Sequence, residues 1–461
     1  MLTIYNSLSR KEEPLPDQKK IRLFVCGPTV YDYLHIGNAR TYIFFDFFAK
    51  YLRARGYDVT YVQNITDIDD KIIRRAAEEH KEPAVLAKHF TEAYFEDMKA
   101  LSVDAVSEYA AATNFISQIT AQVERLIDKG FAYKIDDDGW YFDISKDPDY
   151  GKLSGRTVEQ AEDGVTRIDE SVNKKNKGDF CLWKFSTPGE PAWPSSLSEG
   201  RPGWHIEDTA ISEFYFGPQY EIHGGALDLK FPHHEAEIAQ QESASGLKPF
   251  VRLWIHAGLL TVESKKMSKS VGNFMTIRDF LAMHPAVVLR WIVLSHHYRS
   301  PLDFSERVVA QAKSELENLY TLALHAKKAA QEASESTDTP VETTAGIKWK
   351  KAFHEALDED LNTPKAFSIV FEMLKDKELS PGEKVAFLKT LDRMAMLDIK
   401  GAVGRVGEIP AEITKKFQEY EAFRTNKQFI QSDALRKELE GVGYEVRDGA
   451  DGSSLVKKFF S

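Results

Sequence analysis

Two short segments of the sequence carry residue types suited to binding ATP. The first, residues 35–38 (His-Ile-Gly-Asn), lies between a predicted strand at 21–27 and a predicted helix at about 37–55. A strand that leads into a helix start presents free backbone N–H groups and the positive end of the helix dipole to a phosphate. Gly37 allows a close approach of the nucleotide. His35 and Asn38 add neutral hydrogen-bond donors beside the α-phosphate.

The second segment, residues 266–270 (Lys-Met-Ser-Lys-Ser), supplies two cations, Lys266 and Lys269, on a loop rich in serine. Such cations can hold the pyrophosphate that leaves when the α-phosphate is attacked. Each segment alone is more typical of a structural turn or of a solvated loop. Together, and in this order, they predict a site that closes on ATP from two sides.

The same two segments match, in order, the signatures of class I aminoacyl-tRNA synthetases. Four further segments closely resemble the cysteinyl-tRNA synthetases: residues 24–32 (FVCGPTVYD), 64–71 (NITDIDDK), 203–207 (GWHIE) and 231–235 (FPHHE). The resemblance runs essentially from end to end, and the chain is identified as a member of this family. It implies a ligase that activates L-cysteine with Mg²⁺-bound ATP, releases pyrophosphate, and transfers cysteine to the 3′ end of tRNA(Cys).

Three residues offer donor atoms that zinc accepts. His233 and Glu237 are four apart in a predicted helix, so both project from one face, and Cys26 follows the first strand. Without the resemblance, a buried free cysteine beside a solvated helix face is the alternative. The family holds zinc at these three positions and has a second cysteine at the fourth, where this chain has Asp208. We expect Asp208 to complete the site, because a carboxylate can ligate zinc.

The resemblance assigns further roles at matching positions of the sequence. The zinc ion would select cysteine over serine by binding the substrate as a thiolate. The residues expected to act in catalysis are His35, Asn38, Lys266 and Lys269. Those expected to bind ATP are His35, Gly37, Gly225, Asp228 and Lys269. Those expected to line the amino-acid pocket are Thr29, Trp204 and His205. The segment 193–200 lacks the Pro-Trp-Gly of the family.

Near the C-terminus, the family positions that contact the anticodon are held by Arg424, Phe429, Asp433 and Asp448. Charged side chains can read the pairing edges of single-stranded bases, and an aromatic ring can stack on a base. Without the resemblance, these residues are exposed helix charges and a core aromatic residue. The family's last tryptophan is replaced by Leu455 here.

The elements that must position these residues predict an α/β fold. The strand–helix–strand order of residues 21–63 is typical of a doubly wound, Rossmann-type parallel sheet, whose ligands bind at the carboxyl ends of the strands. We expect a catalytic domain at 1–304 with a connective insertion at about 111–200, an α-helical bundle at 305–400, and a small anticodon-binding α+β domain at 401–461. An apolar stripe from Val309 to Ala323 predicts a bundle helix, and Asn362-Thr363-Pro364 predicts the start of another.

Composition limits the partners and the cellular compartment that we expect for the protein. The formal net charge of −11 over 461 residues argues against broad, nonspecific nucleic-acid binding, although a local basic strip can still bind RNA. No run approaches the roughly 20 apolar residues of a membrane span, no signal peptide is visible, and two distant cysteines do not make a disulfide framework. We therefore expect a cytoplasmic protein, and a monomer because no apolar heptad demands a dimer.

Two other functions share parts of the pattern. A ligase that joins cysteine to an amino-sugar acceptor resembles the catalytic half, although the anticodon-like end of this chain argues against it. A non-catalytic tRNA-binding paralogue is indicated only by Asp208, and the lysine-rich segment argues against that. A pyrophosphate-exchange assay separates the catalytic functions from the non-catalytic one.

Overall fold

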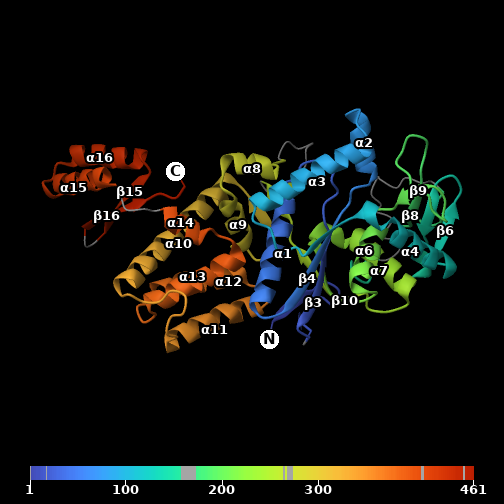
Figure 1. Cartoon of the computed structure of the whole chain (residues 1–461), viewed down its shortest axis with the longest axis horizontal. Coiled ribbons are helices and arrows are strands. Elements are labelled where there is room, and N and C mark those ends of the chain that lie inside the picture. The colour runs from blue at the N-terminus through green and yellow to red at the C-terminus, as the bar shows by residue number, and fades with distance from the viewer. Residues whose placement is uncertain are drawn as a thin grey trace. The chain divides into compact units, whose positions relative to one another are not determined.

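The computed structural model describes residues 2–16, 18–156, 173–262, 265–266, 274–405, 410–449 and 452–460 (Figure 1). These residues group into two compact units. Unit 1 holds Met1–Ala286, Val293–Phe304 and Ala356–Thr363, and unit 2 holds Val287–Ile292, Ser305–Glu355 and Pro364–Ser461. The division into three domains at 304 and 400 stays a prediction.

The centre of unit 1 is a five-stranded parallel sheet with the order β11-β10-β3-β4-β5. Its strands are β3 (Lys20–Val25), β4 (Asp58–Ile65), β5 (Glu108–Ala111), β10 (Tyr220–Ala226) and β11 (Val251–Ala257). The chain winds outward from β3 through β4 to β5, and it returns on the other side of β3 through β10 to β11. This reversal confirms the predicted doubly wound fold, and such sheets bind ligands at the carboxyl ends of the strands where the order reverses.

Helices cover both faces of this sheet. A Cβ atom added at Gly224 of β10 would overlap the ring of Phe45 in α1 (Ile36–Ala54). A Cβ atom added at the next residue, Gly225, would lie 2.8 Å from His234 in α7 (His233–Ser245). Because alternate residues of a strand point to opposite faces, α1 lies on one face and α7 on the other.

Strand β3, which the sequence predicts at residues 21–27, ends earlier than predicted. It ends at Val25 instead of residue 27, because the backbone N–H of Gly27 donates to the side chain of Asn64, at 2.6 Å, and not to a neighbouring strand. Helix α1 follows at Ile36 and ends at Ala54, close to its predicted bounds. Gly56 then takes a φ of +83°, which a glycine adopts readily.

Between β5 and β10, where the sequence predicts short strands, the chain forms an antiparallel sheet. This sheet has the order β6-β7-β8-β9, with the bounds Ala132–Ile135, Gly139–Phe142, Phe180–Phe185 and Gly200–Pro202. Helix α4 (Ile116–Asp128) precedes this sheet, and α6 (Ile206–Phe216) follows it. The segment 150–155 consists of turns.

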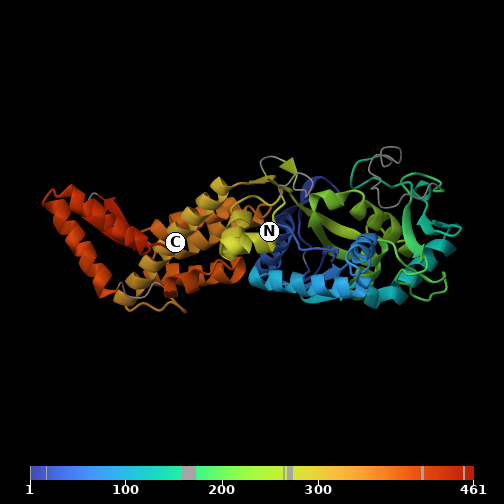
Figure 2. The same ribbon diagram turned by 90° about the horizontal axis from the view of Figure 1, so that it is seen from above.

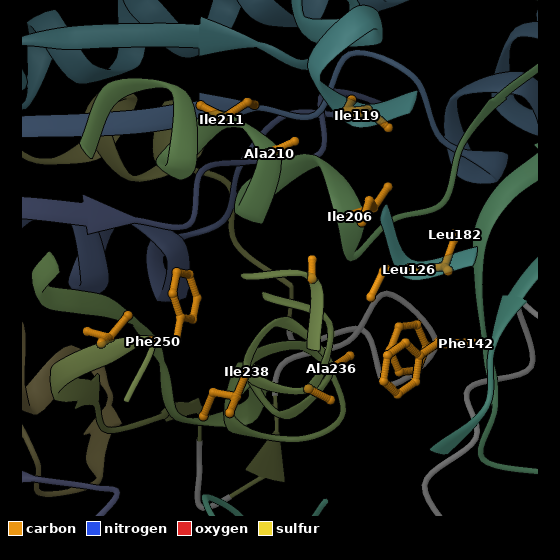
Figure 3. Packing of buried hydrophobic residues seen from close by; sticks show 14 of the residues in the cluster. Ile119, Leu126, Phe142, Leu182, Ile206, Ala210, Ile211, Ala236, Ile238 and Phe250 are labelled. Carbon is orange, nitrogen blue, oxygen red and sulfur yellow. The ribbon is translucent and has the colours of Figure 1, made fainter. Parts of the chain in front are cut away.

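One hydrophobic cluster joins the insertion to the helices that follow. Its members include Ile119 and Leu126 of α4, Phe142 of β7, Leu182 of β8, Ile206 and Ala210 of α6, and Ala236 and Ile238 of α7 (Figure 3). Burial of such side chains stabilises the packing by roughly 1.5–3 kcal/mol each for the larger ones. The cluster therefore fixes α6 against α7. It thereby also positions the polar side chains in the first turns of these two helices.

The other elements of unit 1 surround the sheet. The helices are α2 (Asp70–Glu78), α3 (Pro83–Ala100) and α8 (Ile277–Met283), with short 3₁₀ turns at Ala112–Phe115, Ile144–Lys146 and Leu227–Lys230. The strands are β1 (Thr3–Asn6), β2 (Lys11–Pro14), β12 (Leu260–Val262), β13 (Lys265–Lys266) and β14 (Leu302–Phe304). Helices α9 (Ala286–Leu294) and α11 (Thr344–Asp358) contribute residues to both units.

Unit 2 is mainly helical, as Figure 2 shows from yellow to red. Helices α10 (Glu306–Glu332), α13 (Pro381–Ala395) and α14 (Ile399–Arg405) pack on one another, and α12 (Thr363–Lys375) begins where the sequence predicts. The stripe from Val309 to Ala323 is buried, as expected. The chain ends in α15 (Ala411–Thr425), α16 (Phe429–Gly441) and a hairpin of β15 (Tyr444–Gly449) and β16 (Gly452–Lys457). Across the described ranges, no helix is both long and apolar enough to cross a membrane.

Candidate active site

A cavity of about 230 Å³ lies where β3, β4 and β10 end. The polypeptide after each of these strands contributes to its wall, and so do the first turns of three helices. The wall includes Cys26 and Thr29 after β3, His35 and Asn38 of α1, Trp204 and Asp208 at α6, Asp228 after β10, and His233 of α7. The cavity thus brings together residues that the sequence predicts for the nucleotide, for the amino acid and for the metal.

His35 and Asn38 cap helix α1 reciprocally. The backbone N–H of Asn38 donates to Nδ1 of His35, and the backbone N–H of His35 donates to Oδ1 of Asn38, both at 3.2 Å. This capping box satisfies two backbone donors at the helix start. Because Nδ1 accepts a hydrogen bond, the proton of the neutral His35 ring lies on Nε2. Because Oδ1 of Asn38 also accepts, the donor that this side chain offers is its amide group.

The chain on both sides of the lysine-rich segment is hydrogen-bonded to neighbouring backbone. The backbone N–H of Ile36 donates to the carbonyl of Met275 at 3.1 Å, and that of Ile277 donates to the carbonyl of Leu34 at 2.9 Å. At the other end, Lys266 pairs with Thr261 between β13 and β12. Residues 267–273, including Lys269, and the side chain of Lys266 lie outside the described part of the chain. The described chain just after the lysine-rich segment is therefore bonded through its backbone to the start of α1.

The four predicted metal ligands meet at the floor of the cavity. Nε2 of His233 lies 3.2 Å from Oδ2 of Asp208 and 3.0 Å from Oε1 of Glu237, and Sγ of Cys26 lies 3.7 Å from the same Glu237 oxygen. All four side chains are buried, and their donor atoms lie within 4.8 Å of one another. A sulfur, an imidazole nitrogen and two carboxylate oxygens are a donor set that fits zinc. We call these four residues the outer tetrad.

Two histidines that the sequence reasoning missed lie against the same cysteine. Sγ of Cys26 is 3.3 Å from Nε2 of His223 and 3.1 Å from Nε2 of His234. With Cys26 and Glu237 they form a second group of four buried donors, which we call the inner tetrad. The sequence signal was the second histidine of Phe-Pro-His-His-Glu, beside His233. For His223, which lies within a strand, no local pattern separates a ligand from a core residue.

Burial shifts the protonation of the donors in both tetrads. It raises the pKa of the Cys26 thiol well above its usual value, and the carboxylates of Glu237 and Asp208 raise it further. Burial and the charge of Asp208 also raise the pKa of Glu237. Burial lowers the pKa of His223 and of His234, so both rings are neutral near pH 7. A divalent cation would offset the cost of the buried negative charge.

Asp208 is held in place by Asn64. Oδ1 of Asn64 accepts from the backbone N–H of Gly27 at 2.6 Å, so its amide donates to Oδ1 of Asp208, also at 2.6 Å. The neighbouring Glu207 accepts from the hydroxyl of Thr66. The turn after β3 and the end of β4 therefore set the position of the carboxylate that stands in place of the family cysteine.

Aromatic rings form the wall around the expected amino-acid pocket. The ring of Trp204 stacks on that of His233 with 4.4 Å between the centroids. The ammonium of Lys71 lies 5.4 Å from the centroid of Trp204 and 5.7 Å from that of Tyr31. Lys71 lines the cavity, and sequence reasoning assigned it no role although it ends the Asn64–Lys71 motif. Thr29 lies on the same wall.

Three predicted residues lie beside the cavity. His205 is buried one layer away, with its Nδ1 2.8 Å from Nδ1 of His233. Gly225 leaves room for the ring of His234, which a Cβ atom there would approach to 2.8 Å. Gly37 lies in the first turn of α1. None of these placements tests the role expected from the resemblance.

The residues expected at the anticodon lie in unit 2. The guanidinium of Arg424 in α15 is 5.7 Å from the ring centroid of Phe429, which begins α16 and is 54% exposed. Asp433 is exposed on α16. Asp448 belongs to β15, and its side chain lies outside the described residues. Leu455 of β16 pairs with Val446 and packs against the small core of this region.

The fold agrees with comparisons to known proteins. A family model for the catalytic domain of tRNA synthetases class I (C) matches residues 12–314, and a DALR domain model matches residues 352–392. Methionyl-tRNA synthetase of Mycobacterium tuberculosis, solved with methionyl-adenylate, shares the fold with a TM-score of 0.61. It is 15% identical over 85% of this chain and 95% of its own. The chain is a member of the class I aminoacyl-tRNA synthetases.

Relatives that match over nearly their whole length identify the family within this class. The cysteine–tRNA ligase of Laribacter hongkongensis is 43% identical over 98% of this chain and 99% of its own length. That of Thermococcus onnurineus is 41% identical, with 98% of each chain covered. The chain belongs to the cysteine–tRNA ligase family.

Proposed function

We propose that this protein charges tRNA(Cys) with cysteine in two steps. In the first, the carboxylate of L-cysteine attacks the α-phosphorus of Mg²⁺-bound ATP, which forms cysteinyl-adenylate and expels pyrophosphate. In the second, a hydroxyl of the terminal adenosine of the tRNA attacks the activated carbonyl, and AMP leaves. The observation that carries the proposal is that one cavity holds both the capped start of α1 and a sulfur-containing donor set for a metal.

The start of α1 serves the first step. Nε2–H of His35 and the amide of Asn38 are the donors that the capping box directs away from the backbone, and the helix dipole adds positive potential. Negative charge grows on the α-phosphate oxygens in the transition state, so donors fixed beside them lower the barrier. Asp228 would accept hydrogen bonds from the ribose, Gly37 and Gly225 would border the nucleotide, and Lys266 and Lys269 would hold pyrophosphate.

The outer tetrad would select cysteine as the amino acid to be activated. Cys26, Asp208, His233 and Glu237 would hold a zinc ion, which would supply a preference for a thiolate over a hydroxyl. Shape alone discriminates poorly between such similar substrates, because small changes in a pocket are worth only about 1–3 kcal/mol. Thr29 and Trp204 line the pocket, His205 supports His233, and the ammonium of Lys71 is placed to attract the substrate carboxylate.

In the second step the protein must recognise both the acceptor end and the anticodon of the tRNA. We assign the insertion at about 111–200 to the acceptor end, and Arg424, Phe429, Asp433 and Asp448 of the C-terminal region to the anticodon. An exposed aromatic ring beside an arginine suits the stacking and hydrogen bonding of unpaired bases. The monomeric state and the cytoplasmic location expected from the sequence stay predictions.

The test is a pair of assays on the purified full-length protein. Exchange of labelled pyrophosphate into ATP should depend on cysteine and respond weakly to serine, and labelled cysteine should be transferred to tRNA. Exchange without transfer to tRNA would favour a ligase with another amine acceptor. Absence of both reactions would favour a non-catalytic paralogue and would overturn the proposal.

A further inference from the structure

Arg40, in the second turn of α1, carries its charged group into the protein interior. Its side chain is 2% exposed, and its guanidinium donates to backbone carbonyls of two separate segments. We propose that Arg40 is a positioning residue for the first step of the reaction, because it fixes the strand that leads to Lys266 and Lys269 relative to the start of α1. This role rests on the proposed function, in which the two lysines hold pyrophosphate.

Four backbone carbonyls surround the guanidinium of Arg40. Nη1 donates to the carbonyl of Leu259 at 2.6 Å. Nη2 donates to that of Ser300, and it lies 3.2 Å from the carbonyl of Tyr298 and 3.5 Å from that of His297. The first of these residues stands directly before β12, and the other three stand just before β14. One side chain of α1 therefore fastens both segments to the helix.

Strand β12 is the element that these contacts fix. It pairs with β14 on one side and with β13 on the other, where Thr261 lies opposite Lys266. The turn before β12 is tightly packed, since a Cβ atom added at Gly258 would lie 2.6 Å from the carbonyl oxygen of Arg299 and 2.6 Å from that of Ser300. A shift of this turn would therefore carry β12 with it, and with β12 the backbone at Lys266.

The chemistry of the link is specific to arginine. Burial lowers the pKa of Arg40 to about 10, so the guanidinium is still charged near pH 7. Among the described residues it forms no ion pair, and the carbonyl dipoles take the place of a counter-charge. A planar fork of donors can reach two segments at once, whereas the ammonium of a lysine is a single point of charge. Because a buried charge without hydrogen bonds is costly, the two segments keep their places around it.

The link should matter for adenylate formation more than for transfer to tRNA. His35 and Asn38 act from the start of the same helix, and the two lysines would hold the pyrophosphate that leaves in the first step. Such groups lower a barrier only when their positions are fixed beforehand. Transfer of cysteine follows after pyrophosphate has left, so it does not depend on where the lysines lie.

The test measures the two steps separately on full-length variants. Arg40→Met removes every donor, and adenylate formation is expected to slow at least about 10-fold, since small misplacements of groups at a reacting centre can cost about 100-fold. The KM for pyrophosphate in the reverse reaction should rise, while the KM for cysteine and the rate of transfer from preformed adenylate to tRNA stay nearly unchanged. Arg40→Lys keeps the charge and should recover part of the rate of adenylate formation.

A matched control is Arg22 of β3, which donates to the carbonyl of Phe216 and to the carboxylate of Glu221 near the amino ends of the strands. Arg22→Lys weakens a similar link away from the cavity, so it should leave both steps nearly unchanged. Equal losses of both steps in the Arg40 variants would mean that the residue only supports the fold, and would overturn the proposal.

The unaltered protein separates this inference from the proposed function. If it shows no cysteine-dependent exchange of pyrophosphate, both fall. If it shows exchange and the Arg40 variants lose both steps equally, only the role of Arg40 falls. Should Arg40→Met fail to fold, the milder Arg40→Lys decides by the same comparison, with a smaller loss that is expected in the first step alone.

Discussion

Asp97 of α3 and Arg278 of α8 form an ion pair, with 3.0 Å between Oδ1 and Nε, one residue beyond the point where Ile277 bonds to Leu34. The guanidinium of Arg278 also lies 4.8 Å from the ring centroid of Tyr33. These contacts hold the start of α8, which follows the lysine-rich segment, against α3 and against Tyr33 of the cavity wall. Burial nevertheless raises the pKa of Asp97 to about 6, although Arg278 favours the charged form.

This pKa gives the contribution of Asp97 to stability a definite sign. Between pH 4 and pH 6 the folded protein holds a proton on Asp97 that the unfolded chain has lost, so stability falls as pH rises through this window. The loss is on the order of 1–3 kcal/mol. Asp97→Asn should therefore lose less stability than the unaltered protein when denaturation midpoints at pH 4.5 and pH 7.5 are compared.

The neighbouring Glu96 provides the control for Asp97. It also contacts Arg278, at 2.7 Å, but its side chain is 71% exposed. Glu96→Gln should keep the pH dependence of the unaltered protein, because the carboxylate of Glu96 is solvated both in the folded protein and in the unfolded chain. An equal pH dependence in all three proteins would show that the burial of Asp97 carries no such cost.

The amide of Asn38 can be separated from its capping role. Asn38→Asp keeps an oxygen for the backbone N–H of His35, so the melting temperature should stay within a few degrees of the original. It removes the amide donor and adds negative charge beside ATP, so cysteine-dependent pyrophosphate exchange should fall by about 10²-fold, as for other lost transition-state donors. Asn38→Ala should also lose about 0.5–2 kcal/mol of stability with the cap. Full exchange activity in Asn38→Asp would remove Asn38 from the reaction.

The ammonium of Lys71 should act on cysteine and not on ATP. Lys71→Met keeps most of the side-chain volume between Tyr31 and Trp204 but removes the charge. Since hydrogen bonds to charged groups are worth about 1.5–3 kcal/mol, the KM for cysteine in pyrophosphate exchange should rise at least 10-fold, with the KM for ATP nearly unchanged. Lys71→Arg should recover part of the loss. Equal changes in both constants would mean that Lys71 only supports the packing of the wall.

Arg424 should matter for tRNA and not for the chemistry of activation. Arg424→Ala is expected to lower the kcat/KM for tRNA roughly 5- to 150-fold, which corresponds to about 1–3 kcal/mol, while pyrophosphate exchange stays unchanged. Lys416→Ala, in the same helix, removes a partly buried cation that pairs with Glu438 at 3.1 Å and serves as the control. Loss of both activities in Arg424→Ala would show that the residue is structural.

Local sequence was enough to predict several of the elements. The start of α12 at Thr363 and the stripe of α10 follow from caps and helical spacing, which act over a few residues. The order of the two signature segments, with their strand and helix, predicted the ATP side of the cavity. The resemblance supplied the outer metal ligands, because each stands in a recognisable motif.

Tertiary structure alone decided what else surrounds Cys26. His223 comes within 3.3 Å of its sulfur because β10 pairs with β3, with Gly224 beside Val25, although the two residues are 197 apart in sequence. His234 joins them because the glycine at 225 leaves room for its ring under α7. A histidine in a buried strand has no local signature of its partners, since strand order and register are set by packing over the whole sheet. The inner tetrad therefore emerges only once the sheet is assembled.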